Sequence, residues 1–124
     1  MSPTEPPKRR DLIERTTSFA HAVRVFINKI PRTINTIEDC KQVVRASGSI
    51  GANFIEANEA LSEKDGTTRL KICRKEARET LYWLQLLLPD VPENHVYEAR
   101  ALLQEAHELT LILQTIIRKR STAT

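Results

Sequence analysis

Apolar residues recur every three or four positions along four long segments of the chain, a spacing typical of amphipathic helices. The expected helices cover about residues 11–29, 36–61, 67–88 and 93–120. Pro31 ends the first helix, because a proline disfavours the helical conformation of the residue before it. Thr36 and Asp39 have the spacing of a capping box at the start of the second helix. Gly66 closes a polar turn after that helix, and Pro92 lies near the first turn of the fourth.

The positions that repeat on one side of each helix form the predicted core. Cys40 and Cys73 fall on these sides, and we expect two buried free thiols because they lie far apart without a partner. The predicted core residues are Leu12, Thr16, Phe19, Val23, Phe26, Ile30, Ile37, Cys40, Val43, Val44, Ile50, Phe54, Ala57, Leu61, Leu70, Cys73, Ala77, Leu81, Leu84, Leu88, Ala99, Leu102, Ala106, Leu109, Leu113 and Ile116.

Four helices of similar length with short connections predict an all-α fold, an antiparallel up-down-up-down four-helix bundle. Only three glycines are present, too few for the frequent turns of an all-β fold. We expect one domain over residues 11–120. The proline-rich residues 1–10 and the last residues, 121–124, are expected to be disordered tails.

The fourth helix carries apolar residues beyond its regular stripe, on a second side. A helix that is apolar around so much of its girth is expected to be buried on both sides. Because the chain supplies only three other helices, the second side is predicted to contact another subunit of a homo-oligomeric ring. The predicted interface residues are Leu103, Leu111, Ile112 and Ile117.

The stretch from 45 to 57 combines small and polar residues inside the second helix, although each interior glycine costs a helix about 1 kcal/mol relative to alanine. One interpretation is close packing, in which the small residues Ser47, Gly48, Gly51 and Ala52 let a neighbouring helix approach. The other is a polar row on one face, formed by Arg45, Ser49, Asn53 and Glu56. Such a row could join Glu76 or Glu79 of the third helix in a buried network.

Basic residues are more informative than the net charge of +3. Lys71, Arg74, Lys75 and Arg78 form a stripe along the third helix. The predicted topology gathers further cations at one end of the bundle, namely Lys8, Arg9, Arg10, Lys64, Arg69, Arg118, Lys119 and Arg120. Clustered cations bind the phosphates of RNA or DNA. The alternative is that both groups are ordinary solvated surface.

Patterns for catalysis or metal binding are missing. The three histidines follow Ser18, Pro92 and Gln104 by three positions, where a di-metal bundle needs glutamate. We therefore predict a protein without enzymatic activity, metal or cofactor. The sequence also has no signal peptide and no long apolar run, which predicts a cytoplasmic protein that does not enter the membrane.

Two runs of sequence resemble one known family. They are Arg-Ala-Ser-Gly-Ser-Ile-Gly-Ala-Asn-Phe-Ile-Glu-Ala over 45–57 and Leu-Lys-Ile-Cys-Arg-Lys-Glu-Ala-Arg-Glu-Thr-Leu-Tyr-Trp-Leu over 70–84. Both are similar to the bacterial four-helix-bundle proteins encoded in intervening sequences of 23S ribosomal RNA genes. The resemblance covers about residues 12–113. That family is close to the accessory protein of diversity-generating retroelements, a basic pentamer that joins a reverse transcriptase and binds nucleic acid.

The resemblance implies a homo-oligomer, a pentamer, and no catalytic residue to carry over. Together with the basic residues it predicts a nucleic-acid-binding accessory protein that assists a reverse transcriptase or an RNA-processing complex. The alternative is an oligomeric scaffold for protein contacts that does not bind nucleic acid.

Overall fold

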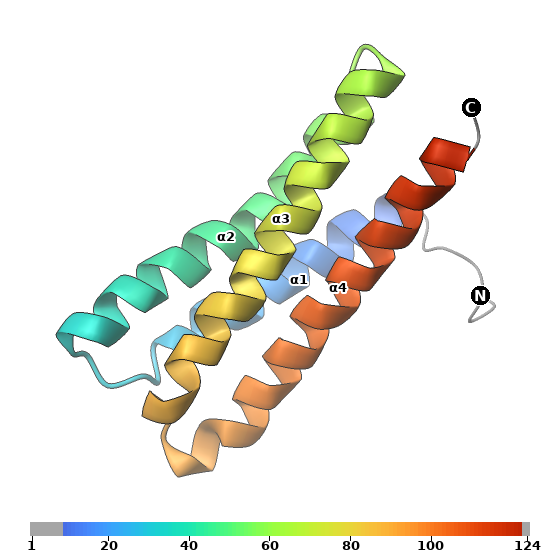
Figure 1. The fold of residues 1–124 in the computed structure, drawn as a ribbon. Helices are drawn as coiled ribbons and strands as arrows, with labels where there is room; N and C mark the ends of the chain where they lie inside the picture. The colour runs from blue at the N-terminus through green and yellow to red at the C-terminus, as the bar shows by residue number, and fades with distance from the viewer. Residues whose placement is uncertain (1–8, 123–124) are drawn as a thin grey trace.

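The computed structural model describes residues 9–122, and it is helical throughout. Figure 1 shows four long helices, α1 (Arg9–Ile27), α2 (Ile34–Asn58), α3 (Glu63–Leu87) and α4 (Val96–Thr122). Two 3₁₀ turns, η1 (Leu88–Asp90) and η2 (Glu93–His95), join α3 to α4. The described residues contain no strand, so the all-α prediction is confirmed. Helices extend two residues beyond the predicted domain at each end, while residues 1–8 and 123–124 of the predicted tails lie outside the described part.

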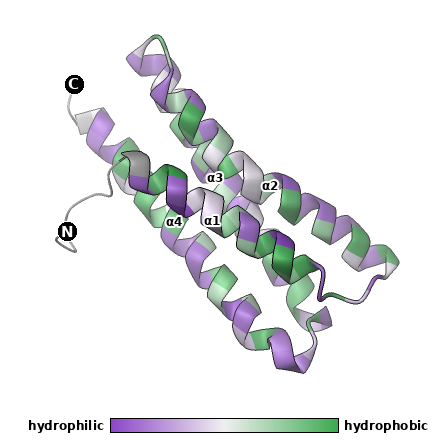
Figure 2. Cartoon of the chain, turned by 180° about the vertical axis from the view of Figure 1, so that it is seen from behind, coloured by the Kyte–Doolittle hydropathy of each residue, from purple (hydrophilic) through white to green (hydrophobic). Residues whose placement is uncertain are grey.

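The four helices bury their apolar stripes against one another (Figure 2). The largest fully buried side chains include Phe26, Leu12 and Ile50. α2 and α3 pack along their lengths, α1 packs on α2, and α4 packs on α3. Burial of this kind, at about 25 cal/mol per Å² of apolar surface, is the main force that stabilises the fold.

Eight core predictions need correction, and four of these residues, Val44, Ala57, Leu81 and Ile116, are half-buried. Ile37 is 44% exposed and Leu61 is fully exposed, because Leu61 lies beyond the end of α2 in the connection to α3. Leu87 is fully buried, whereas the predicted Leu88 is half-buried at the start of η1. Cys40 is half-buried, and only Cys73 is inaccessible.

The ends of α2 and α3 also differ from the prediction. Thr33, not Thr36, is the N-cap of α2: its side chain accepts from the backbone N–H of Thr36 at 3.1 Å, and the Thr36 hydroxyl accepts from the N–H of Thr33 at 2.8 Å. The capping box therefore lies three residues earlier, with threonine in place of the usual glutamate at its second position. Ser62 caps α3, so Gly66 lies inside the first turn of that helix.

Ion pairs link α4 to α1 and to the turn that follows α1. Arg15 Nη2 lies 2.7 Å from Glu105 Oε1 and 3.1 Å from Glu108 Oε2. Lys29 Nζ lies 2.8 Å from Glu98 Oε2. These pairs are partly exposed, so each is worth only about 0–1 kcal/mol, and they orient the two helices more than they stabilise them.

α1 and α2 approach closely at Gly51. A Cβ atom built there would lie 2.8 Å from Thr16 Oγ1, and Thr16 is held in place by a hydrogen bond from its hydroxyl to the carbonyl of Leu12. At Gly48 the nearest atom is Arg24 Nη2 at 3.4 Å, the end of a flexible side chain. Close packing therefore accounts for Gly51 but does not require Gly48.

These distances predict opposite effects for the two glycines. Gly51→Leu should lower the free energy of unfolding by about 1–3 kcal/mol, because it forces α1 away from α2. Gly48→Ala should raise it by about 0.5–1 kcal/mol, the gain in helix propensity. Urea denaturation followed by circular dichroism measures both. A loss of stability in Gly48→Ala equal to that in Gly51→Leu would contradict the packing account.

Candidate nucleic-acid interface

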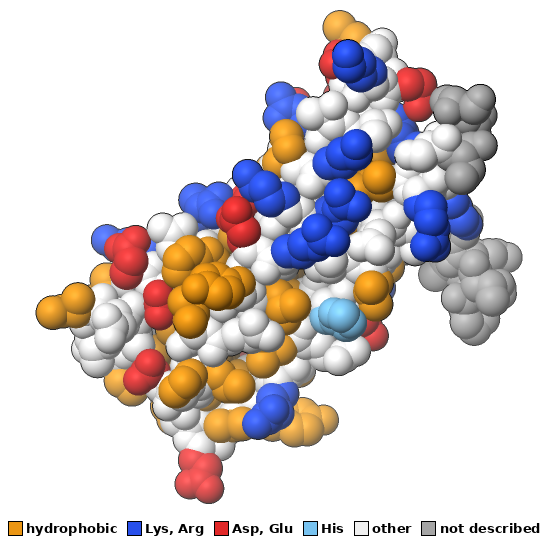
Figure 3. Space-filling model, viewed as in Figure 1, with side chains coloured by type: hydrophobic (Ala, Val, Ile, Leu, Met, Phe, Trp, Pro, Cys, Tyr) orange, Lys and Arg blue, Asp and Glu red, His pale blue; other side chains and the backbone are white. Residues whose placement is uncertain are grey.

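The cationic stripe of α3 consists of Lys71, Arg74, Lys75 and Arg78. Lys71, Lys75 and Arg78 are exposed, and Arg74 is half-buried. Figure 3 shows lysine and arginine side chains gathered over α3 on the face that it shares with α4. Arg78 donates to the side-chain oxygen of Gln114 on α4 at 3.2 Å. Within the described residues, no ion pair neutralises any of the four.

The two acidic residues of α3 that lie between the stripe positions or next to them face a different neighbour. Glu76 and Glu79 both contact Arg45 of α2, whose Nη1 and Nη2 each lie 2.9 Å from one carboxylate. Glu76 is 4% exposed. The hydrogen bond that Arg45 donates to Glu79 contributes most to raising the pKa of Arg45 above its ordinary value, burial opposes this shift, and Glu76 adds to it. On α3, the buried Glu76 therefore lies on the side that faces α2, and Glu79 lies between that side and the cationic stripe.

The predicted polar row of α2 divides into separate parts. Arg45 joins Glu76 and Glu79, as the network hypothesis requires. The side-chain N–H of Asn53 instead donates to the backbone carbonyl of Ser49 at 2.9 Å, within α2. Glu56 is exposed, so the prediction that it belongs to a buried network was wrong.

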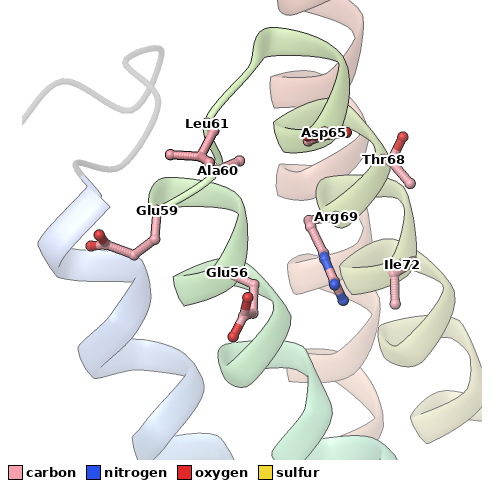
Figure 4. Close-up of a pocket in the computed structure, with 8 residues that line it drawn as sticks. All are labelled: Glu56, Glu59, Ala60, Leu61, Asp65, Thr68, Arg69 and Ile72. Carbon is pink, nitrogen blue, oxygen red and sulfur yellow. The ribbon is translucent and has the colours of Figure 1, made fainter.

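Glu56 lines a hollow at the end of the α2–α3 pair. Figure 4 shows Arg69 pointing toward it, with Glu59, Asp65 and Leu61 around its edge. Arg69 Nη1 also lies 3.5 Å from Asn53 Oδ1. Arg69 therefore faces α2 and the acidic residues of this hollow, although the sequence grouped it with the cations at the basic end of the bundle.

The predicted basic end is assembled only in part. Arg120 of α4 binds two residues at the start of α3. Its Nη2 lies 2.9 Å from Glu63 Oε2, and its Nε donates a hydrogen bond to Thr67 Oγ1 at 3.1 Å. Its guanidinium lies over Gly66, where a Cβ atom would come within 2.8 Å of Arg120 Nη2. Arg120 thus fastens α4 to α3, a structural role that the sequence grouping did not anticipate.

The other members of that end differ in what the structure describes. Lys64, Arg118 and Lys119 are exposed. Arg9 and Arg10 begin α1, but their side chains lie outside the described part, as does the whole of Lys8. Lys64, Arg118 and Lys119 therefore remain the exposed candidates of the predicted basic end.

The predicted oligomer residues of α4 also differ in exposure. Leu111 is 49% exposed, while Leu103 and Ile112 are half-buried against the core. Ile117 is 5% exposed because it packs inside the bundle, so it is not available to a second subunit. Leu111 is the strongest remaining interface candidate.

Cys73 of α3 is fully buried where α3 packs against α2. Its thiol donates to the carbonyl of Ile50 at 2.9 Å, and burial, followed by the charge of Glu76, raises its pKa to about 12. Burial and the charge of Asp39 also raise the pKa of Cys40.

The described residues contain no group of three or more His, Cys, Asp or Glu side chains that could hold a metal ion. None of their helices is long and apolar enough to cross a membrane.

The Cys73 pKa predicts a loss of stability at high pH. The unfolded thiol ionises near 9.0 and the folded thiol only near 12, so the unfolded chain releases its proton first as the pH rises. The contribution of this group is complete below pH 9 and is lost progressively toward pH 12. Urea midpoints measured across this range should fall more steeply for the parent than for Cys73→Ala. Equal slopes would contradict the pKa.

Comparison with known proteins decides the family. The sequence profile of the 23S rRNA-intervening sequence proteins matches residues 8–115. The chain belongs to the 23S rRNA-intervening sequence protein family. This confirms the family resemblance seen in the two sequence runs, which both lie within the matched residues. No curated protein matches the chain.

A solved structure supports the same assignment for this 23S rRNA-intervening sequence protein. It is a protein of unknown function from the S23 ribosomal protein family of Bacteroides thetaiotaomicron. The two chains are 28% identical with a TM-score of 0.72, and the alignment covers 90% of this chain and 99% of that one. The two proteins therefore share most of the helical fold.

Sequence reasoning missed two features beside the stripe. Gln114 of α4 holds the guanidinium of Arg78, and Tyr82, considered only as a rim residue, is 54% exposed. A signal for Tyr82 was present, because it follows Arg78 by four positions and therefore shares its helix face. Nothing in the sequence singled out Gln114, because its role depends on which side of α4 meets α3.

Proposed function

We propose that this 23S rRNA-intervening sequence protein is a non-enzymatic accessory protein that binds the phosphates of RNA or DNA. The supporting observation is the cationic stripe of α3, whose four side chains have no acidic partner among the described residues while the neighbouring carboxylates pair with Arg45. Cations arranged in this way displace counterions from a nucleic-acid backbone, which gives affinity without requiring a particular base sequence.

The proposal includes an antiparallel up-down-up-down arrangement. Contacts between neighbouring helices support it, because the residue number rises on one helix as it falls on the next. Arg45 contacts Glu76 while Ile50 contacts Cys73, and Thr67 contacts Arg120 while Arg78 contacts Gln114. This arrangement leaves the α3–α4 face open along the length of the stripe.

We further propose that copies of the chain assemble into a ring, a pentamer by the family resemblance. A ring would present the stripe several times, and linked sites raise affinity without new contacts. The assembly is proposed to serve a reverse transcriptase or an RNA-processing complex. Co-purification of a tagged chain with the product of a neighbouring reverse transcriptase gene tests that partner, and purification of the tagged chain alone would contradict it.

Titration of a fluorescent oligonucleotide at two salt concentrations tests nucleic-acid binding directly. The affinity should fall as salt rises, with a logarithmic slope of about 0.7 for each contacted phosphate of a single strand. Failure to bind at low salt, or an affinity independent of salt, would overturn the proposal.

Leu111→Lys should dissociate the oligomer, because it places a charge in the proposed subunit contact. Leu111 is preferable to Ile112, since the half-buried Ile112 also packs against the core and its replacement would damage the fold. Light scattering at micromolar concentration should show the parent as a multiple of the 14.2 kDa chain and the variant at the mass of one chain. A parent of monomer mass would contradict the ring.

The second candidate function is a protein-interaction scaffold without nucleic-acid binding. Its support is that large apolar side chains are exposed on α2, α3 and α4, among them Ile34, Tyr82 and Leu111. The salt titration separates the two functions, because a scaffold should leave the oligonucleotide unbound at every salt concentration.

A further inference from the structure

The solvent face of α3 is divided into a cationic part and an aromatic end. At 3.6 residues per turn, Lys71, Lys75, Arg78 and Tyr82 fall within roughly 60° of the helix circumference. The column therefore presents three cations, one turn apart, followed by an aromatic ring. It spans about 16 Å at 1.5 Å per residue, the length of roughly five stacked nucleotides at 3.4 Å each.

Tyr82 is an exposed ring held in a defined position. It is 54% exposed, while its ring centroid lies 5.3 Å from that of Trp83, with the planes at 70° to each other. Trp83 packs partly against the core, so this contact restrains the tyrosine. A restrained ring loses little conformational freedom when a flat partner stacks on it.

We infer that the α3 column binds single-stranded nucleic acid, with the cations on successive phosphates and an unpaired base stacked on Tyr82. This inference rests on the proposed function and specifies its substrate class. A stacked base needs a free face, which single strands offer and the interior of a duplex does not. A duplex would contact the three cations alone.

The column favours a nucleic acid over a protein partner at this site. Phosphates match the three cations, and a base supplies the flat apolar partner that the ring needs beside them. Leu86, 41% exposed, continues the column one turn after Tyr82. It extends the apolar end of the column, so binding of a protein at this end is the competing outcome of the test.

Fluorescence anisotropy with the full chain tests the inference on two probes, a twelve-nucleotide oligothymidine and a duplex of twelve base pairs. Tyr82→Leu should lower affinity for the single strand about tenfold and leave affinity for the duplex unchanged, because base stacking on an aromatic side chain contributes about this factor. Tyr82→Phe should bind like the parent. Tyr97→Leu is the matched control, since Tyr97 is the second of the two tyrosines and is 89% exposed on α4.

Trp83, the single tryptophan, supplies a second measurement. Its emission should be quenched by the single strand in the parent and in Tyr82→Phe, and not in Tyr82→Leu. Parent-like binding of the single strand by Tyr82→Leu would overturn the inference and leave the exposed apolar end as a protein contact. Equal losses on both probes would also overturn it, because Tyr82 would then act only through the fold.

A charge variant separates failure of this inference from failure of the proposed function. Lys75→Glu combined with Arg78→Glu should weaken binding of both probes. If it does so while Tyr82→Leu changes neither probe, phosphate binding stands and the stacked base is excluded. If the charge variant also binds like the parent, the proposed function itself is excluded.

Discussion

Replacing Arg74, Lys75 and Arg78 together with glutamate is expected to lower the affinity for a single-stranded oligonucleotide on the order of a hundredfold at about 0.1 M salt. Three lost phosphate contacts reduce the logarithmic salt slope by about 2, and each unit of slope is worth about tenfold at this salt concentration. Repulsion between the new carboxylates and the phosphates acts in the same direction. Anisotropy titrations at several salt concentrations measure both the affinity and the slope.

A matched variant controls for net charge in that experiment. Arg24, Arg32 and Arg100 are exposed arginines on α1, in the following loop and on α4, and their replacement with glutamate changes the charge by the same amount. This variant should keep most of the affinity, and both variants should keep the helical circular dichroism signal. An equal loss of affinity in the control variant would show that binding depends on overall charge. Binding by the stripe variant with the affinity of the parent would show that the stripe is only a solvated surface.

Arg45→Met is expected to lower the free energy of unfolding by about 2–4 kcal/mol, a large part of the 5–15 kcal/mol typical of a domain. The reason is that the substitution removes the guanidinium that lies 2.9 Å from the carboxylate of Glu76. The side chain of Glu76 is only 6% exposed, so its charge would stay buried without this partner. Half of the Arg45 side chain is exposed, so water reaches the site and the expected loss lies below that of a fully buried pair. Urea denaturation measures it.

Two further variants test whether the loss of stability comes from the unpaired charge of the buried Glu76 carboxylate. Glu76→Met combined with Arg45→Met should recover much of the loss, because an apolar pair leaves no buried charge unpaired. Arg15→Met is the control at a more exposed ion pair, that with Glu105 and Glu108, and it should cost only about 0–1 kcal/mol. A loss in Arg15→Met as large as that in Arg45→Met would contradict the special importance of Glu76.

The helices were predictable from sequence where the spacing of apolar residues within one segment is enough to indicate a helix. The stripe from Leu12 to Phe26 is buried as its spacing predicts. The errors arose at the ends of the helices, where several nearby polar side chains could each form the cap. Thr33 displaced Thr36 as the N-cap because the hydroxyl of Thr36 is buried and also donates to the carbonyl of Pro31 at 2.6 Å.

The candidate site was partly predictable for the same reason. The four cations of α3 share a face by helical spacing alone, whatever the rest of the molecule does. Placing Arg69 and Arg120 together at a basic end of the bundle required knowledge of the neighbouring helices. Arg69 turns toward Asn53 of α2, and Arg120 binds Glu63 of α3, so both are engaged within the bundle.

By itself the sequence determined the four helices, their apolar sides and the cationic stripe, because all three depend on the repeat of one helix. The tertiary structure decided that Arg45 of the central stretch holds Glu76 and Glu79, that Gly51 meets Thr16, and that Ile117 lies in the core. These facts depend on the rotation of one helix against another. Neighbouring residues point about 100° apart, so a small rotation exchanges a buried residue for an exposed one, and only packing against the other helices sets it.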